Sequence, residues 1–304
     1  MIEASGISKF FSVVNEKGLA EGLTAVLNVS LTIEDGRIVS LLGPSGCGKS
    51  TFLEILAGLQ APTDGQIRID GKLVLEPLPS TRKEMEEYKR RYRFISPLAN
   101  GVFTDRPKHD IAMIFQDYAV FPWMTAAQNV IFALNIRAAD KKGPERPGRS
   151  EIRDKARFYL NKAGLAGMEN KYPSQLSGGM RQRLALARAL SVEPRIILMD
   201  EPFAAVDALQ REKLQDDLLR LWGGAKAGGS PITIVMVSHD VQEAVFLSDE
   251  VIVFSPGPGG TIRNRIPVDA PRPRARTSPT IVDIQERILA ILQYDINQES
   301  ACAI

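Results

Sequence analysis

Residues 41–50 read LLGPSGCGKS and follow directly on an apolar run. The spacing G-x-x-x-x-G-K-[ST] is met here by Gly43, Gly48, Lys49 and Ser50. In this motif the backbone N–H groups of a glycine-rich turn surround phosphate oxygens. Glycine suits such a turn because it adopts positive φ and leaves the backbone bare for a ligand. The stretch therefore predicts a strand, a phosphate-binding loop and a helix, against the alternative of a glycine-rich turn without a ligand.

The loop's side chains predict how a nucleoside triphosphate would be held. The Lys49 ammonium would reach the outer phosphates, and the Ser50 hydroxyl would ligate Mg²⁺. A helix expected over 51–58 would direct the positive end of its dipole at the same anion. The loop residues expected to contact the nucleotide are Gly43, Ser45, Gly46, Cys47, Gly48, Lys49, Ser50 and Thr51.

The composition indicates a folded chain and disfavours some partners. Hydrophobic residues make up 44% of the 304 residues, enough for a sizeable core. A formal net charge of +2 lacks the basic balance of a duplex-binding protein, so we expect no nucleic-acid partner. The two cysteines, Cys47 and Cys302, make a poor disulfide framework and favour a reducing compartment. The first residues lack a leader pattern and no run approaches 18 apolar residues, so any membrane contact should go through another protein.

Strand-like apolar runs alternate with helical patterns, such as 209–222 and 151–163. This alternation predicts an α/β fold with a mostly parallel sheet, its strands buried on both faces. A helical block over about 117–190 interrupts it. The expected strands are 29–33, 38–42, 111–115, 196–199, 232–237 and 251–254.

Two segments depart from this pattern. Residues 78–109 form a polar insertion with eight Lys and Arg against four Asp and Glu. The insertion is either a solvated surface excursion or a contact for a partner or acidic lipid headgroups. Residues 256–304 are rich in Pro, Gly and Arg up to an amphipathic helix near 281–292. We expect a nucleotide-binding domain over 1–255 and a C-terminal tail with a terminal helix over 256–304.

The strand expected at 196–199 ends in two carboxylates, Asp200 and Glu201. Ligands bind at this edge of open α/β sheets. Asp200 is expected to hold Mg²⁺ through its water shell, and Glu201 to polarise the water that attacks the γ-phosphate. A strand ending in acidic residues is also ordinary turn chemistry, so the pattern gains weight only beside the phosphate loop.

Residues 176–183, LSGGMRQR, place a serine and bare backbone at the start of another helix, which predicts a second anion site. Here the sequence resembles the ATP-binding-cassette (ABC) ATPases, whose signature reads L-S-G-G-Q. Met180 stands where glutamine is most frequent, a departure that many importers share. The resemblance implies a fold of the ABC-type P-loop NTPases, with an antiparallel β portion and an inserted helical subdomain. It also implies two cassettes packed head to tail, so that the signature of one closes over the γ-phosphate held by the other. The signature residues implied at the nucleotide are Ser177, Gly178, Gly179 and Gln182.

The resemblance covers nearly the whole chain, with the motifs in the family's order. Gln116 resembles the glutamine that reaches Mg²⁺ and the attacking water, and His239 resembles the switch histidine that contacts the γ-phosphate. Asp207 resembles the D-loop aspartate, although Ala204 replaces a small polar residue often found there. Taken alone, such a glutamine is usually a surface residue and such a histidine is more often structural.

Phe11 stands where the family has an aromatic residue that stacks on adenine, with Phe10 as the competing choice. The implied cofactors are ATP and Mg²⁺. The implied catalytic residues are Lys49, Gln116, Glu201 and His239, and the implied metal ligands are Ser50, Gln116 and Asp200.

Residues 115–130, FQDYAVFPWMTAAQNV, resemble the L-P-W-x-T-x-x-x-N-V segment of importers for nitrate, sulfonates and taurine. In those importers the segment shapes the groove that takes a coupling helix of a membrane subunit. The tail over 255–274 resembles the same subfamily, whereas the insertion at 78–109 replaces a short turn there. No long coiled coil separates the loop from the signature, and no second cassette is present, which disfavours repair and ribosomal ABC ATPases.

The resemblance therefore implies an importer subunit that dimerises around two Mg·ATP and powers uptake of a small, anionic solute. Its partners would be a second cassette, membrane permease subunits and, indirectly, a substrate-binding protein, at the cytoplasmic face of the inner membrane. The alternative is a soluble ABC ATPase that acts as an assembly or regulatory module without a transport partner. A small-molecule P-loop kinase is disfavoured because it gives the signature no role.

Overall fold

The computed structural model describes residues 1–14, 20–77, 102–103, 111–139, 145–204, 206–228 and 232–302. Its contacts divide the chain into two units, Met1–Arg106 with Val235–Ile304 and Pro107–Ile234. Most of the insertion at 78–109 lies outside the described residues, so its expected roles stay predictions. Within the described part of the chain, no helix combines the length and the apolar character needed to cross a bilayer.

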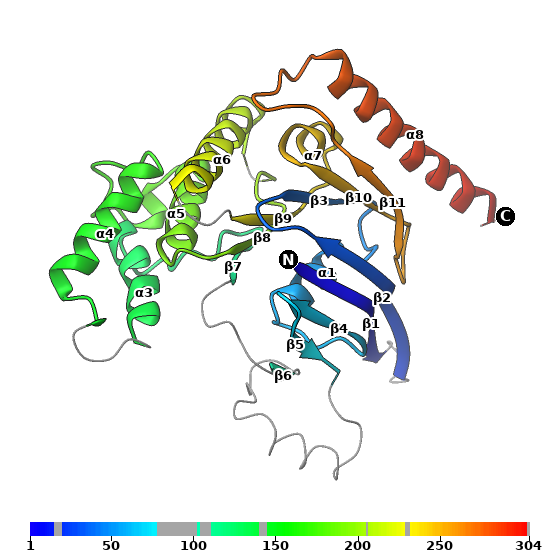
Figure 1. Ribbon diagram of the computed structural model, residues 1–304, viewed down its shortest axis with the longest axis horizontal. Coiled ribbons are helices and arrows are strands. Elements are labelled where there is room, and N and C mark those ends of the chain that lie inside the picture. The colour runs from blue at the N-terminus through cyan, green and yellow to red at the C-terminus, as the bar shows by residue number, and fades with distance from the viewer. Residues whose placement is uncertain are drawn as a thin grey trace, which may run out of the picture. The chain divides into compact units, whose positions relative to one another are not determined.

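The first unit, Met1–Arg106 with Val235–Ile304, contains an antiparallel sheet in the order β2-β1-β4-β5-β6 (Figure 1). It also holds the strands β11-β10-β3 of a second sheet and the end of β9 (Thr233–Val237); in this sheet β3 and β10 are parallel and β11 forms an antiparallel edge. The strands are β1 (Ile2–Val14), β2 (Ala20–Ile33), β3 (Ile38–Leu42), β4 (Asp64–Ile69), β5 (Lys72–Glu76), β6 (Val102–Phe103), β10 (Glu250–Phe254) and β11 (Ile262–Pro267). The helices are α1 (Lys49–Leu56), α7 (Val241–Leu247) and α8 (Pro279–Cys302).

Apolar periodicity explains how α8 joins the first unit. Ile281, Ile284 and Ile288 recur at helical spacing and are buried in one cluster with residues of α7, β10 and β11. Arg274, just before α8, is also buried, and its guanidinium donates hydrogen bonds to five carbonyl groups around the end of α7. These contacts tie residues 262–292 to the first unit.

The second unit, Pro107–Ile234, pairs β7 with β8 in parallel, in the order β9-β8-β7, and β9 carries the chain into the first unit. Three helices, α3, α4 and α5, share a core that includes Leu134, Leu160 and Leu184. Its elements are β7 (Ile111–Ile114), α3 (Ala126–Ala138), α4 (Arg149–Lys162), the short 3₁₀ helix η2 (Pro173–Gln175), α5 (Gly178–Ser191), β8 (Ile196–Asp200), α6 (Ala208–Gly228) and β9 (Thr233–Val237).

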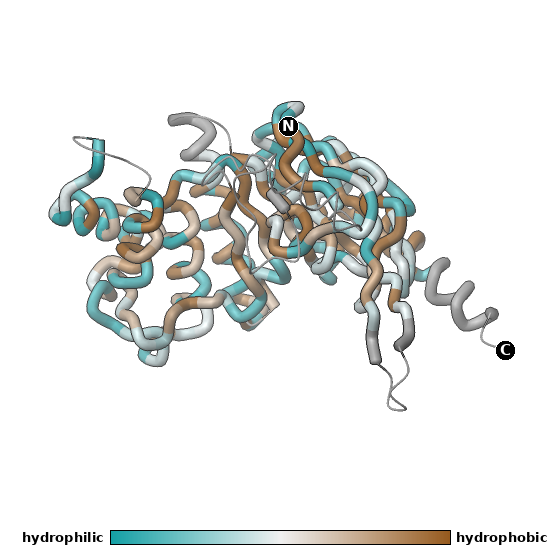
Figure 2. The backbone as a smooth tube through the Cα atoms, turned by 90° about the horizontal axis from the view of Figure 1, so that it is seen from below, coloured by the Kyte–Doolittle hydropathy of each residue, from teal (hydrophilic) through white to brown (hydrophobic). Residues whose placement is uncertain are grey.

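The predicted α/β fold is confirmed, including its mostly parallel sheet, its antiparallel portion and its helical block. Strands β3 and β9 are buried along their whole length, as their largely apolar sequences predict. Figure 2 shows hydrophobic residues along the interior segments of the tube and hydrophilic residues toward its outer turns. Five expected strands agree with the structure to within one residue at each end, and the sixth, 29–33, is the end of the longer β2. The domain boundary expected at residue 255 stays a prediction.

Candidate nucleotide-binding and catalytic site

The phosphate loop predicted at 43–50 connects β3 to α1 in the first unit. Gly46 and Gly48 both adopt left-handed φ, at 80° and 95°. A Cβ atom on Gly48 would lie only 2.1 Å from the carbonyl oxygen of Ala25, so no other residue fits there. Gly48 is the N-cap of α1, whose first residue is Lys49. The sequence thus folds locally as the motif predicts.

Lys49 lies across this loop with only 6% of its surface exposed. Its ammonium donates to the carbonyl oxygens of Gly43 at 2.8 Å and Pro44 at 2.7 Å, and lies 3.5 Å from Cys47 Sγ. These partners are neutral, so they fix the ammonium without cancelling its charge. A fixed charge beside backbone N–H groups is suited to a polyanion.

The other loop residues differ in exposure. Ser45 and Gly46 are exposed, whereas the Cys47 side chain is fully buried. A nucleotide would therefore meet Cys47 through its backbone. Ser50 and Thr51 are partly exposed at the start of α1.

Phe11 is half-buried on β1, opposite Leu23 of β2. The Lys9 ammonium lies 5.1 Å from the centre of the Phe11 ring and donates to the carbonyl oxygen of Ala61 at 2.8 Å. Burial lowers the pKa of Lys9. Phe10 is more exposed, at 45%. The choice of Phe11 for adenine stacking stays a prediction.

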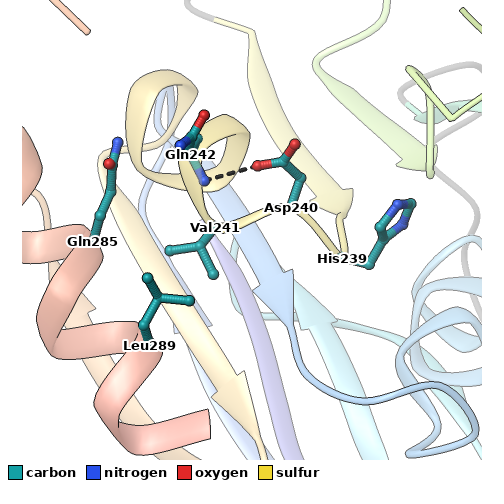
Figure 3. Close-up of a pocket in the computed structure, with 6 residues that line it drawn as sticks. All are labelled: His239, Asp240, Val241, Gln242, Gln285 and Leu289. Atoms are coloured by element: carbon teal, nitrogen blue, oxygen red, sulfur yellow. Dashed lines mark hydrogen bonds between the residues drawn. The ribbon is translucent and has the colours of Figure 1, made fainter. Parts of the chain in front are cut away.

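His239 is exposed just after β9. The Asp240 carboxylate accepts hydrogen bonds from the N–H groups of Gln242 and Glu243 and so caps α7. Figure 3 shows a hollow between this segment and α8, with a volume of about 430 Å³. Its lining residues are His239, Asp240, Val241, Gln242, Gln285 and Leu289, the last two from α8.

In the second unit, parallel pairing brings two predicted catalytic residues together. Ile114 of β7 is in register with Met199 of β8. Gln116 and Glu201 each lie two residues further along the sequence from these positions. Gln116 Nε2 donates to Glu201 Oε2 at 3.0 Å. Glu201 has a left-handed φ of 44°, a strained conformation for a residue with a side chain. Asp200 is the last residue of β8, one position before it.

The signature segment begins α5, as predicted. Ser177 is the N-cap, and its hydroxyl accepts a hydrogen bond from the N–H of Met180 at 3.3 Å. Ser177 is exposed, Gly178 is partly exposed and Gly179 is buried. The Gln182 side chain is buried, and its polar atoms have no hydrogen-bond partner among the described residues. Ser177 and Gly178 are therefore accessible to an anion, whereas Gln182 is buried, and its contact with a nucleotide stays a prediction.

Asp207 is exposed before α6. Its carboxylate accepts a hydrogen bond from the N–H of Gln210 at 3.0 Å, and its carbonyl accepts from the N–H of Arg211. This is the geometry of a helix cap, so Asp207 has a structural role whatever its role at a nucleotide.

Two further residues position this part of the second unit. Asn129 is fully buried and makes four hydrogen bonds to the backbone of residues 121–125. Arg188 donates to the carbonyl oxygens of Tyr118 and Ala119, which both have positive φ. Asn129 lies in the stretch 115–130 that the sequence analysis singled out. In contrast, nothing in the sequence around Arg188 indicated its partners.

The described residues contain no group of three or more His, Cys, Asp or Glu side chains that could hold a metal ion. Mg²⁺ is usually held by one or two protein oxygen atoms together with substrate phosphates. The hydroxyl of Ser50, the amide oxygen of Gln116 and the carboxylate of Asp200 are oxygen donors of this kind. Each predicted ligand is thus chemically suited to an ion that arrives with a nucleotide, and their assembly into one site stays a prediction.

The family described as "ABC transporter" matches residues 26–204. The Aliphatic sulfonates import ATP-binding protein SsuB of Bacillus licheniformis is 37% identical, over 91% of each chain. The Bicarbonate transport ATP-binding protein CmpD of Synechocystis is 34% identical, over 83% of this chain and 75% of that one. A solved dimeric structure of the ATP-binding cassette MJ0796, bound to ADP and Pi, matches with a TM-score of 0.65 at 30% identity, covering 89% of this chain and all of the other.

Proposed function

Because the chain belongs to the ABC transporter family, we propose that it is the ATP-hydrolysing subunit of an importer. ATP binding and hydrolysis characterise this family. The subunit dimerises around two Mg·ATP and drives uptake of a small anion through separate membrane subunits.

The shape of the phosphate loop is the observation that carries this proposal. Its glycines leave the backbone open, and the buried Lys49 ammonium is held by the carbonyl oxygens of Gly43 and Pro44. When a triphosphate binds, the ammonium exchanges these neutral partners for phosphate oxygens, a stronger charge-assisted contact. The dipole of α1 adds to the attraction.

Hydrolysis requires a group that orients water at the γ-phosphate, and Glu201 fits this role. Its carboxylate accepts a hydrogen bond from Gln116, which fixes its orientation before a substrate arrives. A carboxylate so placed accepts a proton from water as the oxygen attacks phosphorus. Bound Mg²⁺ would neutralise developing charge on the phosphates. His239 would contact the γ-phosphate.

The exposed signature residues support a dimer. Ser177 and Gly178 offer a hydroxyl, bare backbone and the positive end of α5. In a head-to-tail pair they would cover the γ-phosphate held by the other copy's loop. The relative MJ0796 is a dimer in its solved structure.

The importer role and the anionic solute are supported by relatives of SsuB and CmpD type, whose names specify sulfonates and bicarbonate. The segment over 115–130 that resembles the permease-binding groove exposes Trp123, at 69%. Just beyond it, Phe132 and Ile136 of α3 are 39% and 50% exposed. Large exposed apolar groups of this kind mark interaction sites.

ATP turnover by the purified chain tests the enzymatic part. Glu201→Gln should still bind ATP while hydrolysis falls at least about 100-fold, with dimers accumulating in ATP, because only the proton acceptor is removed. Lys49→Ala should lose nucleotide binding. Glu151→Gln, an exposed carboxylate on α4, is the matched control and should hydrolyse ATP normally. Full turnover by Glu201→Gln would remove Glu201 from this role.

Co-purification tests the transport part. Permease subunits encoded beside this chain should bind it, and uptake of a sulfonate or bicarbonate into proteoliposomes should require both ATP and Glu201. If the chain hydrolyses ATP but binds no membrane subunit, the assembly or regulatory role replaces the importer role.

A further inference from the structure

The turn that follows β10, residues 255–261, packs its backbone directly against the phosphate loop, and both belong to the first unit. A Cβ atom on Gly257 would lie 2.7 Å from the carbonyl oxygen of Gly46 and 2.8 Å from Cys47 Cα. One on Gly260 would lie 2.1 Å from the carbonyl oxygen of Cys47. Real Cβ contacts essentially never fall below 3.0 Å, so any side chain must displace the turn or the loop.

Neither of these glycines is required by its own backbone conformation. Gly257 and Gly260 are absent from the described residues with positive φ, in contrast to Gly259 at 81°. Their φ values therefore lie outside the left-handed region that favours glycine. The close approach to the loop is what excludes a side chain.

The turn is itself held in place. The N–H of Ser255 donates to the carbonyl oxygen of Thr261 at 2.9 Å, and the N–H of Thr261 donates to Ser255 Oγ at 3.0 Å. The carbonyl oxygen of Gly260 accepts from the N–H of Leu27 at 3.2 Å, beside a parallel bridge between Val26 and Gly260. The turn is thus closed at its base and attached to β2.

The loop is confined from other directions as well. The Ala25 carbonyl of β2 approaches Gly48, and the Phe254 carbonyl of β10 lies 3.0 Å from where a Cβ of Gly43 would stand. The backbone partners in these contacts belong to β2, to β10 or to the closed turn.

We propose that the turn over 255–261 positions the phosphate loop for ATP, with Gly257 and Gly260 as the positioning residues. A loop rich in glycine has many backbone conformations, and binding a triphosphate selects the one whose N–H groups converge. Backbone packing from the turn selects that conformation in advance, so less ordering is needed when ATP binds. This inference rests on the proposed function, that the loop binds ATP.

The two glycines predict graded effects. In Gly257→Ala the contacts are a few tenths of an ångström too short, so the loop shifts slightly and the dissociation constant for ATP should rise about 10-fold. In Gly260→Ala the Cys47 carbonyl must move by about 1 Å, so more of the preformed loop geometry is lost and the dissociation constant for ATP should rise further, on the order of 100-fold. Gly22→Ala is the matched control, because a Cβ there meets nothing within 4 Å.

The experiment titrates the purified full chain and these variants with a fluorescent ATP analogue, measures KM and kcat for ATP, and records the Tm of each without nucleotide. A positioning role raises Kd and KM with little change in kcat at saturation, while the nucleotide-free Tm of Gly257→Ala stays within about 3 °C of the unsubstituted chain. A role in stability alone would lower Tm and leave KM unchanged. If Gly260→Ala does not fold, Gly257→Ala decides.

Two outcomes overturn the inference while leaving the proposed function standing: Gly257→Ala binds ATP as tightly as Gly22→Ala, or its weaker binding follows entirely from unfolding. If the unsubstituted chain binds no ATP, the proposed function fails first and the positioning role fails with it.

Discussion

Asn129→Ala should destabilise the second unit, because Asn129 holds the loop that exposes Trp123. Its side-chain oxygen accepts from the N–H of Phe121 at 2.8 Å, and its NH₂ group donates to the carbonyl oxygens of Phe121, Met124 and Thr125 at 3.1–3.2 Å. Two N–H groups share those three acceptors, so they count as about two hydrogen bonds. With about 1 kcal/mol net for each of three hydrogen bonds, and more where a buried group is orphaned, the free energy of unfolding should fall by about 3 kcal/mol.

Urea denaturation, followed by circular dichroism and tryptophan fluorescence, measures this loss. Asn129→Asp keeps the size and the acceptor but loses the donors, so it should be destabilised at least as much as Asn129→Ala. Asn161→Ala, on the exposed side of α4, should change the free energy of unfolding by less than about 0.5 kcal/mol. A loss below about 1 kcal/mol in Asn129→Ala would refute the idea that these hydrogen bonds hold the loop.

Substitutions at three other positions test further features of the structure. Arg274→Ala should cost about 3 kcal/mol or more in urea denaturation, and Arg274→Lys nearly as much, because an ammonium cannot reach all five carbonyl oxygens. Burial acts to raise the pKa of Glu193, but the Lys155 ammonium at 2.6 Å contributes to a net lowering of this pKa. The ionised Glu193 carboxylate therefore stabilises the fold above pH 4.5, and this contribution decreases as the pH falls below 4.5. Glu193→Gln should therefore lose less stability than the unsubstituted chain between pH 5 and pH 3, by under about 1 kcal/mol because the pair is partly exposed; equal losses would contradict this. Trp123→Ala should leave the unfolding free energy within about 0.5 kcal/mol and reduce co-purification with a permease; undiminished binding would exclude Trp123 from the interface.

The residues that could be predicted from the sequence are those whose chemistry requires neighbours in the chain. The phosphate loop needs its glycines, Lys49 and Ser50 in one short segment, and a helix cap needs Ser177 directly before α5. The spacing of the residues therefore predicted both. The meeting of Gln116 and Glu201 follows from parallel pairing of two recognisable strands. Contacts between distant segments leave no such trace. Arg188 reaches Ala119 across 69 residues, and only the folded loop explains why a guanidinium is needed there.

The antiparallel sheet shows the same limit at the level of whole strands. Strand β1 contains Gly6 and several polar residues, and a single apolar run does not mark it out. It is stabilised by partners at a distance, with Ile2 opposite Ile33 on one side and Ile69 on the other. Long-range pairing of this kind overrides weak local preference. The resemblance to the family predicted the antiparallel portion, whereas composition and periodicity located only the end of β2.

The C-terminal tail is the part of the chain where the composition is the poorest guide to the structure. Its Pro, Gly and Arg residues are typical of a surface linker, yet Arg274 is buried and two glycines touch the phosphate loop. Burial lowers the pKa of Arg274 to about 10, helped by Arg272 and opposed by Asp249, so the fold bears a cost for keeping this charge inside. Five carbonyl partners offset that cost, which a linker would have no reason to incur. In this tail, Arg274 thus binds the end of α7, and Gly257 packs against the phosphate loop. The substitutions at Arg274 and Gly257 test these two roles separately.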